Sequence, residues 1–204
     1  MYWNLLKEVI YGNWPMIVIF LVTMTTLRFF YLLHHKNKIS FYREIFNIIS
    51  IVYILLLFQL LTTSEANIGG GYNIMPFTEM TRYTFGSNLF MLNVVGNIVI
   101  FIPFGFFVTY YLKTKKIILP LIVTAIVSTC VEFIQLGIGR SFDVDDIILN
   151  LAGSIIGFLI FVGLKSLKKH LPNFFQKDRL YNIVCIIILI VFILYILKLS
   201  GVFS

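Results

Sequence analysis

Residues 117–164 read IILPLIVTAIVSTCVEFIQLGI, then GRSFDVDD, then IILNLAGSIIGFLIFVGL. Two apolar runs, 117–138 and 147–164, are thus joined by a short polar connection with three aspartates and one arginine. A helix needs about 20 mainly apolar residues to cross the hydrocarbon core of a bilayer. Helices are required there because lipid offers no hydrogen-bond partner to free backbone groups. The stretch therefore predicts two neighbouring transmembrane helices.

The rest of the chain repeats this apolar character. Of the 204 residues, 59% are hydrophobic and only 12% are charged, with a mean hydropathy of +0.95. A water-soluble domain of this size could not bury so much apolar side chain, so much of it must face lipid. We expect an all-α, polytopic transmembrane bundle that forms a single membrane domain over residues 1–204. Its six predicted spans are 14–33, 45–62, 88–112, 117–138, 147–164 and 181–200.

The positive charges indicate how the spans are oriented. Eleven Lys and Arg residues lie in alternate connections: three in 34–44, three in 113–116 and five in 165–179. The opposite side carries only Lys7, Arg82, Arg140 and Lys198. Because cytoplasmic loops are enriched in Lys and Arg, both termini are predicted to be extracytoplasmic. Short basic clusters between apolar runs are membrane orientation signals, so the net charge of +7 does not indicate a nucleic-acid partner.

A carboxylate falls inside the predicted span 117–138. Ser128, Glu132 and Gln135 follow one another at steps of four and three, which places them on one helical face. Glu132 would lie roughly 9 Å inside the outer boundary, given the rise of a helix. An ionisable group at this depth is a functional hypothesis by default. The structural alternative is an ion pair with Arg140 or Arg82.

Two further polar stripes point to the same end of the bundle. Asn93 and Asn97 share one face near the outer end of the span 88–112, where the alternative role is to hold helices together. In the span 147–164 and the connection before it, one stripe contains Asp143, Asp146, Asn150, Gly153 and Gly157. The two glycines, four residues apart, indicate a surface for close helix packing. We interpret Asp145 as a solvated acid opposite the positive end of a helix dipole.

The predicted outer connection 63–87 is long. It turns apolar at Ile74-Met75-Pro76-Phe77. Connections of this length are often functional or partly re-entrant.

These residues together predict a polar cavity that opens to the outer leaflet. Glu132, Asp143 and Asp146 are the candidate catalytic groups, as general acid, general base or ligand holders. The same three carboxylates could hold a divalent cation, since hard cations prefer oxygen ligands. The histidines, His34, His35 and His170, all lie on the inner side. The candidate substrate-binding residues are Asn93, Asn97, Gln135, Arg140, Asn150 and Arg82.

In these motifs the chain resembles the VanZ-like family. The resemblance covers about residues 50–165. In chain order, its segments are Asn73-Ile74-Met75-Pro76-Phe77, Asn93-x-x-Gly96-Asn97, Phe101-x-Pro103-x-Gly105, Glu132-x-x-Gln135, Gly139-Arg140, Asp143-x-x-Asp146, Asn150, Gly153 and Gly157.

The resemblance implies a protein of the bacterial cytoplasmic membrane that lowers susceptibility to teicoplanin and related lipid-tailed glycopeptides. Its functional face would be extracytoplasmic, and its ligand a lipid-linked cell-wall precursor, the glycopeptide or membrane lipid. Whether the chain is an enzyme stays open. One alternative is a non-catalytic protein that binds precursors or cell-wall enzymes. A proton-coupled transporter is less favoured, because the inner halves of the spans are almost wholly apolar.

Overall fold

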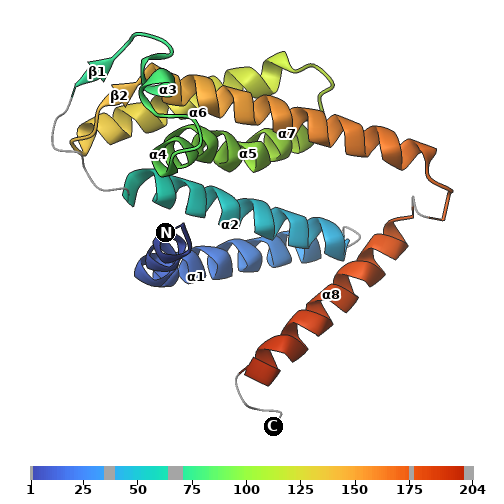
Figure 1. Cartoon of the computed structure of the whole chain (residues 1–204). Coiled ribbons are helices and arrows are strands. Elements are labelled where there is room, and N and C mark those ends of the chain that lie inside the picture. Colours follow the sequence, from blue (N-terminus) through green and yellow to red (C-terminus); the bar gives the residue numbers. More distant parts are fainter. Residues whose placement is uncertain (1, 35–39, 64–70, 175–176, 200–204) are drawn as a thin grey trace. The chain divides into compact units, whose positions relative to one another are not determined.

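The computed structural model of the chain describes residues 2–34, 40–63, 71–174 and 177–199 (Figure 1). These residues are almost entirely helical, which confirms the predicted all-α class. The main helices are α1 (Tyr2–His34), α2 (Phe41–Thr63), α5 (Gly96–Leu112), α6 (Ile118–Gly137), α7 (Val144–His170) and α8 (Asp178–Leu199). The shorter elements are α3 (Thr78–Arg82), α4 (Asn88–Phe90), the π-helical turn η1 (Met91–Val95), β1 (Tyr72–Asn73) and β2 (Phe142–Asp143).

Within the described residues, four helical stretches are long and apolar enough to cross a membrane, namely Phe41–Leu61, Asn88–Leu112, Ile118–Gly137 and Val144–His170. They correspond to the second to fifth predicted spans. The first and last predicted spans fall on α1 and α8, which are helical but are not among these four. Residues 1 and 200–204 lie outside the described residues. Six spans with extracytoplasmic termini therefore stay a prediction.

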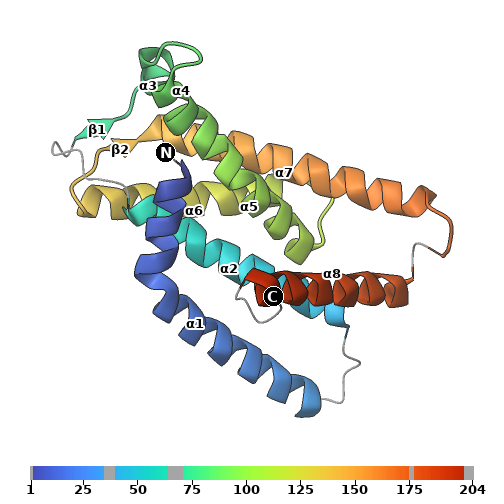
Figure 2. The ribbon, with the colours of Figure 1, turned by 60° about the horizontal axis from the view of Figure 1, so that its bottom comes forward.

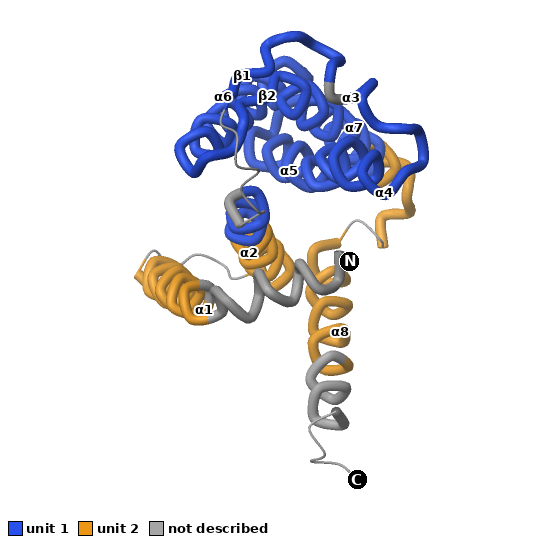
Figure 3. Tube along the Cα trace, turned by 60° about the vertical axis from the view of Figure 1, so that its left-hand side comes forward, with its two compact units in different colours: residues 1–13, 54–165 blue, residues 14–53, 166–204 orange. Residues whose placement is uncertain are grey.

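The chain divides into two compact units (Figure 3). One contains residues 1–13 and 54–165, and the other contains residues 14–53 and 166–204. All the residues of the predicted site belong to the first unit. In that unit α5, α6 and α7 lie side by side, and α6 and α7 run in opposite directions (Figures 1 and 2). Their buried apolar residues include Phe101, Phe104, Val131, Leu149 and Phe158.

Glycine brings α5 and α7 close together. A Cβ atom added at Gly157 would overlap the carbonyl oxygen of Ile102, and one at Gly153 would overlap that of Ile98. A Cβ at Gly105 would in turn overlap the backbone of Ser154. Small residues let helix backbones approach in a membrane, where no hydrophobic force drives helices together. This confirms the close-packing role predicted for Gly153 and Gly157.

The long outer connection has its own structure. β1 pairs in parallel with β2, with Tyr72 opposite Phe142 and Asn73 opposite Asp143. Phe142 N donates to Gly71 O at 2.9 Å, and α3 follows five residues after β1. The connection therefore packs against the polar turn between α6 and α7.

In the second unit, polar contacts join residues near the basic connections. The guanidinium of Arg28 binds the carboxylate of Glu44, with Nε–Oε2 at 2.9 Å. Arg43 Nη2 lies 2.8 Å from Asp178 Oδ2, and Tyr42 N donates to Asn182 Oδ1 at 3.0 Å. These contacts link α1 with α2 and α2 with α8.

Candidate functional site

Glu132 is almost completely buried in α6, with 1% of its surface exposed. Ser128, one turn earlier, and Gln135, three residues later, are buried on the same helix. The predicted shared face of these three residues is therefore confirmed. Within the part of the chain that the structure describes, Glu132 forms no ion pair; its Oε2 accepts a hydrogen bond from Asp143 N at 2.9 Å. The ion pair with Arg140 or Arg82, which was the structural alternative for this carboxylate, is not formed among the described residues.

Asp143 organises the start of α7. Its Oδ1 accepts from Asp145 N at 2.8 Å, as an N-cap carboxylate does when it satisfies a free N–H of the first helical turn. The same oxygen accepts from Asn73 Nδ2 at 3.2 Å. The residue therefore has three structural links: to Glu132 through its N–H, to α7, and to β1 through its carboxylate.

Asp145 differs most from its predicted state. The expectation of a solvated acid is wrong, because the exposed fraction of Asp145 is 0%. It does lie in the first turn of α7, but its Oδ1 accepts from Phe77 N at 2.5 Å and its Oδ2 from Met80 N at 3.4 Å. Asp145 thus holds the start of α3. The sequence contains one signal for this contact. The family motif includes both the segment 73–77, which contains Phe77, and the segment 143–146, which contains Asp145.

Polar side chains of α6 and α7 pair in successive steps. Thr124 Oγ1 donates to Ser154 Oγ at 2.8 Å, and Asn150 Nδ2 donates to Ser128 Oγ at 2.8 Å. With the bond from Asp143 N to Glu132, these contacts form a row that we call the polar ladder. Its members on α6 are Thr124, Ser128 and Glu132, four residues apart.

The ladder extends about 12 Å along α6, at the rise of a helix. It therefore reaches well into the span. Ser128, Glu132 and Asn150 were predicted from the sequence, whereas Thr124 and Ser154 were missed. Their signal was the continued spacing of four along each helix.

A further polar contact, next to the polar ladder, joins α7 to α5. Asn97 Nδ2 donates to Asp146 Oδ1 at 2.5 Å, so two of the predicted site residues are in contact. Asn93 is not brought to them: it lies in η1 and is exposed. Arg82 is likewise exposed, on α3. The structure therefore gathers Asn97, Asp146 and Asn150 around α7 and leaves Asn93 and Arg82 at the surface.

Gln135 and Arg140 contact the end of α2. Gln135 Nε2 donates to Leu61 O at 3.0 Å, and Arg140 Nη1 donates to the same oxygen at 3.3 Å. The last carbonyls of a helix have no partner within the helix and carry partial negative charge, which favours donors and a cation there. Both predicted binding residues therefore have a structural task as well.

In this site, among the residues that the structure describes, two buried side-chain oxygens lack a hydrogen-bond partner, Gln135 Oε1 and Asn150 Oδ1. Both residues are 2% exposed. A buried acceptor without a partner costs free energy, so each is a place where a donor from a ligand or water would be stabilised.

The predicted metal site can be compared with the geometry of the carboxylates. Among the described residues, no group of three or more His, Cys, Asp or Glu side chains is placed to hold a metal ion. Asp143 Oδ1 already accepts two hydrogen bonds and Asp145 accepts two. What the arrangement offers chemically is hydrogen bonding and proton exchange at buried carboxylates.

The long apolar helices and the buried polar ladder define the class of protein: an all-helical protein with helices suited to a membrane. The chain belongs to the VanZ/LLP1 family, whose model matches residues 16–166. The match begins closer to the N-terminus than the resemblance, which covered about residues 50–165. No curated protein and no solved structure matches the chain.

Proposed function

We propose that this chain is a multi-pass protein of the bacterial cytoplasmic membrane that acts at the extracytoplasmic face. There it binds or modifies a lipid-linked or amphipathic ligand of the cell envelope. In doing so it lowers susceptibility to teicoplanin-type lipoglycopeptides. Membership of the VanZ/LLP1 family supports the proposal, together with the excess of positive charge in the connections 34–44, 113–116 and 165–179.

The observation that carries the proposal is the burial of Glu132 in an apolar helix. An ionised carboxylate inside a membrane span costs about 2 kcal/mol or more unless it is paired or hydrated. Here its Oε2 receives only a backbone N–H, from Asp143. A group this costly is retained for a function more readily than for packing. Glu132 is accordingly our candidate acid or base.

The neighbouring residues have roles that suit such a ligand. Asp143 and Asp146 would position it, and Arg140 would bind a phosphate, which guanidinium groups recognise well. Asn97, Asn150 and Gln135 would donate or accept hydrogen bonds. The oxygens without partners, on Asn150 and Gln135, are the acceptors that a hydroxyl or ammonium group would reach.

A non-catalytic binding role is the second candidate. Many polar atoms of the cluster are already hydrogen-bonded within the chain, as in the contacts of Asp145, Asn97 and Thr124. A site of this kind can recognise a precursor or an enzyme of cell-wall synthesis without chemistry. Transport has less support, because the polar ladder ends at Thr124 and Ser154 and the inner parts of these helices are mainly apolar.

The test is expression in a teicoplanin-susceptible Gram-positive bacterium. The unmodified chain should raise the inhibitory concentration of teicoplanin. Glu132→Gln, which keeps the shape and removes the charge, should abolish the rise at equal amounts of membrane-inserted protein. Glu44→Gln is the matched control, because it changes the same chemical group in the ion pair with Arg28, outside the site.

The outcomes separate the candidates. If the folded, unmodified chain leaves the inhibitory concentration unchanged, the proposed role is wrong. If Glu132→Gln abolishes the effect while ligand binding persists, catalysis is supported. A partial loss that follows the number of contacts removed, at Asn97, Asn150 and Arg140, indicates binding alone.

A further inference from the structure

The segment 72–91 exposes an unusual amount of apolar side chain. Phe85 is 89% exposed and Met75 is 75% exposed. We call this segment the apolar elbow. Its exposed apolar residues are Tyr72, Ile74, Met75, Phe77, Phe85, Leu89 and Met91. Exposed apolar side chains gathered on one segment indicate contact with a protein or a membrane, whereas isolated exposed apolar residues are ordinary.

Hydrogen bonds from the polar site fix the elbow in place. The buried carboxylate of Asp145 accepts from Phe77 N and Met80 N. Asp143 holds Asn73 at the other end of the same turn. Phe77 adopts a left-handed backbone with φ of 68°, which is unfavourable for a bulky residue. The exposure of Met75 and Phe77 is therefore imposed by specific contacts and does not result from a loose loop.

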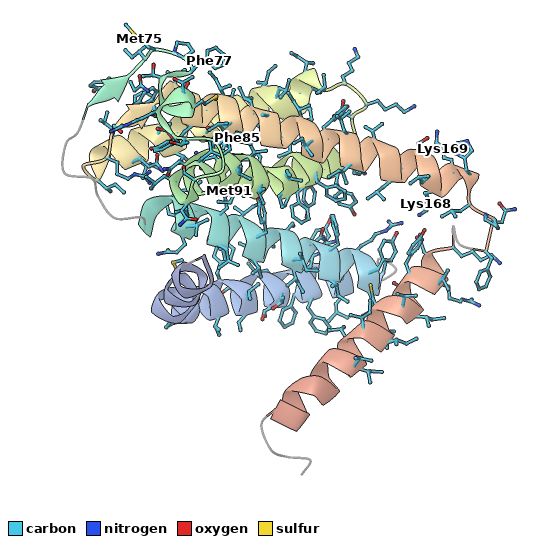
Figure 4. The ribbon with its side chains drawn as sticks, in the orientation of Figure 1. Met75, Phe77, Phe85, Met91, Lys168 and Lys169 are labelled. Atoms are coloured by element: carbon cyan, nitrogen blue, oxygen red, sulfur yellow. The ribbon has the colours of Figure 1, made fainter. Side chains whose placement is uncertain are left out.

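The elbow lies beside the first turns of α7 and at the N-terminal end of α4 (Figures 1 and 2). In Figures 1 and 2, α6 and α7 run across the view, and α3 lies next to the first turns of α7 without passing the outer end of α6. Figure 4 shows Met75 and Phe77 near each other above these turns, with Phe85 and Met91 at the start of the stretch that continues as α5. A segment that lies beside membrane-spanning helices contacts lipid. A segment that lies beyond their ends contacts water instead.

The apolar surface is continuous with the exposed faces of two candidate spans. Leu89, Met91 and Val99 are exposed along the stretch Asn88–Leu112. On the other side, the ring of Phe142 lies 6.2 Å from that of Tyr72 and 5.2 Å from that of Phe133, which is exposed on α6. Exposed faces of a span face lipid, and tyrosine rings such as that of Tyr72 are enriched where the hydrocarbon core ends.

We propose that the apolar elbow inserts into the bilayer at the end of the spans where α7 begins, so that Met75, Phe77 and Phe85 contact lipid acyl chains. With extracytoplasmic termini this is the outer leaflet. The occupant of the surface is lipid, because the surface continues that of the spans and the sequence of the segment 72–91 has only two charged residues, Glu79 and Arg82. The proposal does not depend on teicoplanin or on catalysis.

The test uses tryptophan fluorescence of the full chain in phosphatidylcholine vesicles. Trp3 and Trp14 are replaced by Phe to remove the native signal. Single tryptophans are then placed by Met75→Trp, Phe85→Trp, Ile126→Trp and Lys115→Trp. Ile126 is exposed near the middle of α6 and is the control for lipid contact. Lys115 is exposed between α5 and α6 and is the control for water. Each protein is measured with ordinary and with acyl-brominated lipid.

Bromine quenches tryptophan only on contact, so the readings distinguish the possible environments. Met75→Trp and Phe85→Trp should lose fluorescence in brominated lipid to nearly the extent of Ile126→Trp, with blue-shifted emission. Emission and quenching equal to those of Lys115→Trp would place the elbow in water and overturn the proposal. Blue-shifted emission without quenching would also overturn it, because a second protein copy would then cover the surface. Unchanged helical circular dichroism confirms that each variant is folded.

Discussion

Glu132, Asp143 and Asp145 carry the same functional group in different environments. Asp145 accepts hydrogen bonds from two backbone N–H groups of the apolar elbow, and Asp143 accepts from Asn73 and from the first turn of α7. Glu132 accepts from the backbone of Asp143 and lies inside the span. The hydrogen-bond donors around each of the three carboxylates determine its role. Asp143 and Asp145 therefore hold structure, while Glu132 is the group best suited to chemistry.

Asp145→Asn tests the structural role at the scale of one residue. The variant loses one acceptor oxygen and brings an amide N–H₂ toward a backbone donor. A buried group left without its partner costs about 1–3 kcal/mol. We expect a lower midpoint of thermal unfolding in detergent and faster proteolysis within residues 71–87. Ser141→Ala, at an exposed position of the neighbouring turn, is the control and should leave both unchanged. Equal stability of both variants would contradict the role given to Asp145.

At the scale of elements, α7 is the helix on which the site is assembled. One part of its surface carries Asp146, Asn150 and Ser154, and another carries Gly153 and Gly157 against α5. Close packing and polar pairing thus occur on the same helix. If α5 moved away, the contact between Asn97 and Asp146 would be lost.

Gly157→Ala tests this packing. A Cβ at Gly157 would meet backbone atoms of Ile102 and Phe106, which cannot rotate aside as a side chain can. Overpacking of this kind costs roughly 1–3 kcal/mol. Unfolding of the variant in detergent should therefore occur at a lower temperature.

Gly163→Ala is the matched control in the same helix. Nothing lies within 4 Å of a Cβ added there. It should be neutral or stabilising by up to about 1 kcal/mol, because alanine favours a helix over glycine. If the two variants unfold alike, the inferred contact between α5 and α7 is incorrect.

At the scale of the whole molecule, the placement of every site residue follows from the orientation of the spans. The orientation rests on the eleven positive residues in alternate connections. The proposed orientation would place the polar turn between α6 and α7 outside the cell, where cell-wall precursors and lipoglycopeptides are found. The proposed function requires this orientation.

Cysteine labelling tests the orientation. In a background with Cys130 and Cys185 replaced by serine, single cysteines are introduced by Ser141→Cys, Lys115→Cys and Ser204→Cys. A membrane-impermeant maleimide should label Ser141→Cys and Ser204→Cys in intact cells, and Lys115→Cys only after permeabilisation. The opposite result for Ser141 and Lys115 would invert the orientation. Labelling of Ser204→Cys only after permeabilisation would mean an odd number of crossings between α6 and the C-terminus.

The sequence by itself determined the helical class, the second to fifth spans, the polar face of α6 and the packing glycines of α7. Each of these depends on local periodicity: run length sets a span, and steps of three and four set a face. Only the tertiary structure decided four other features of the site. These are the burial of Asp145, the pairing of Thr124 with Ser154, the contacts of Gln135 and Arg140 with Leu61, and the exposure of Asn93. Each depends on which distant segment lies opposite, and that information is absent from the spacing of residues along one helix.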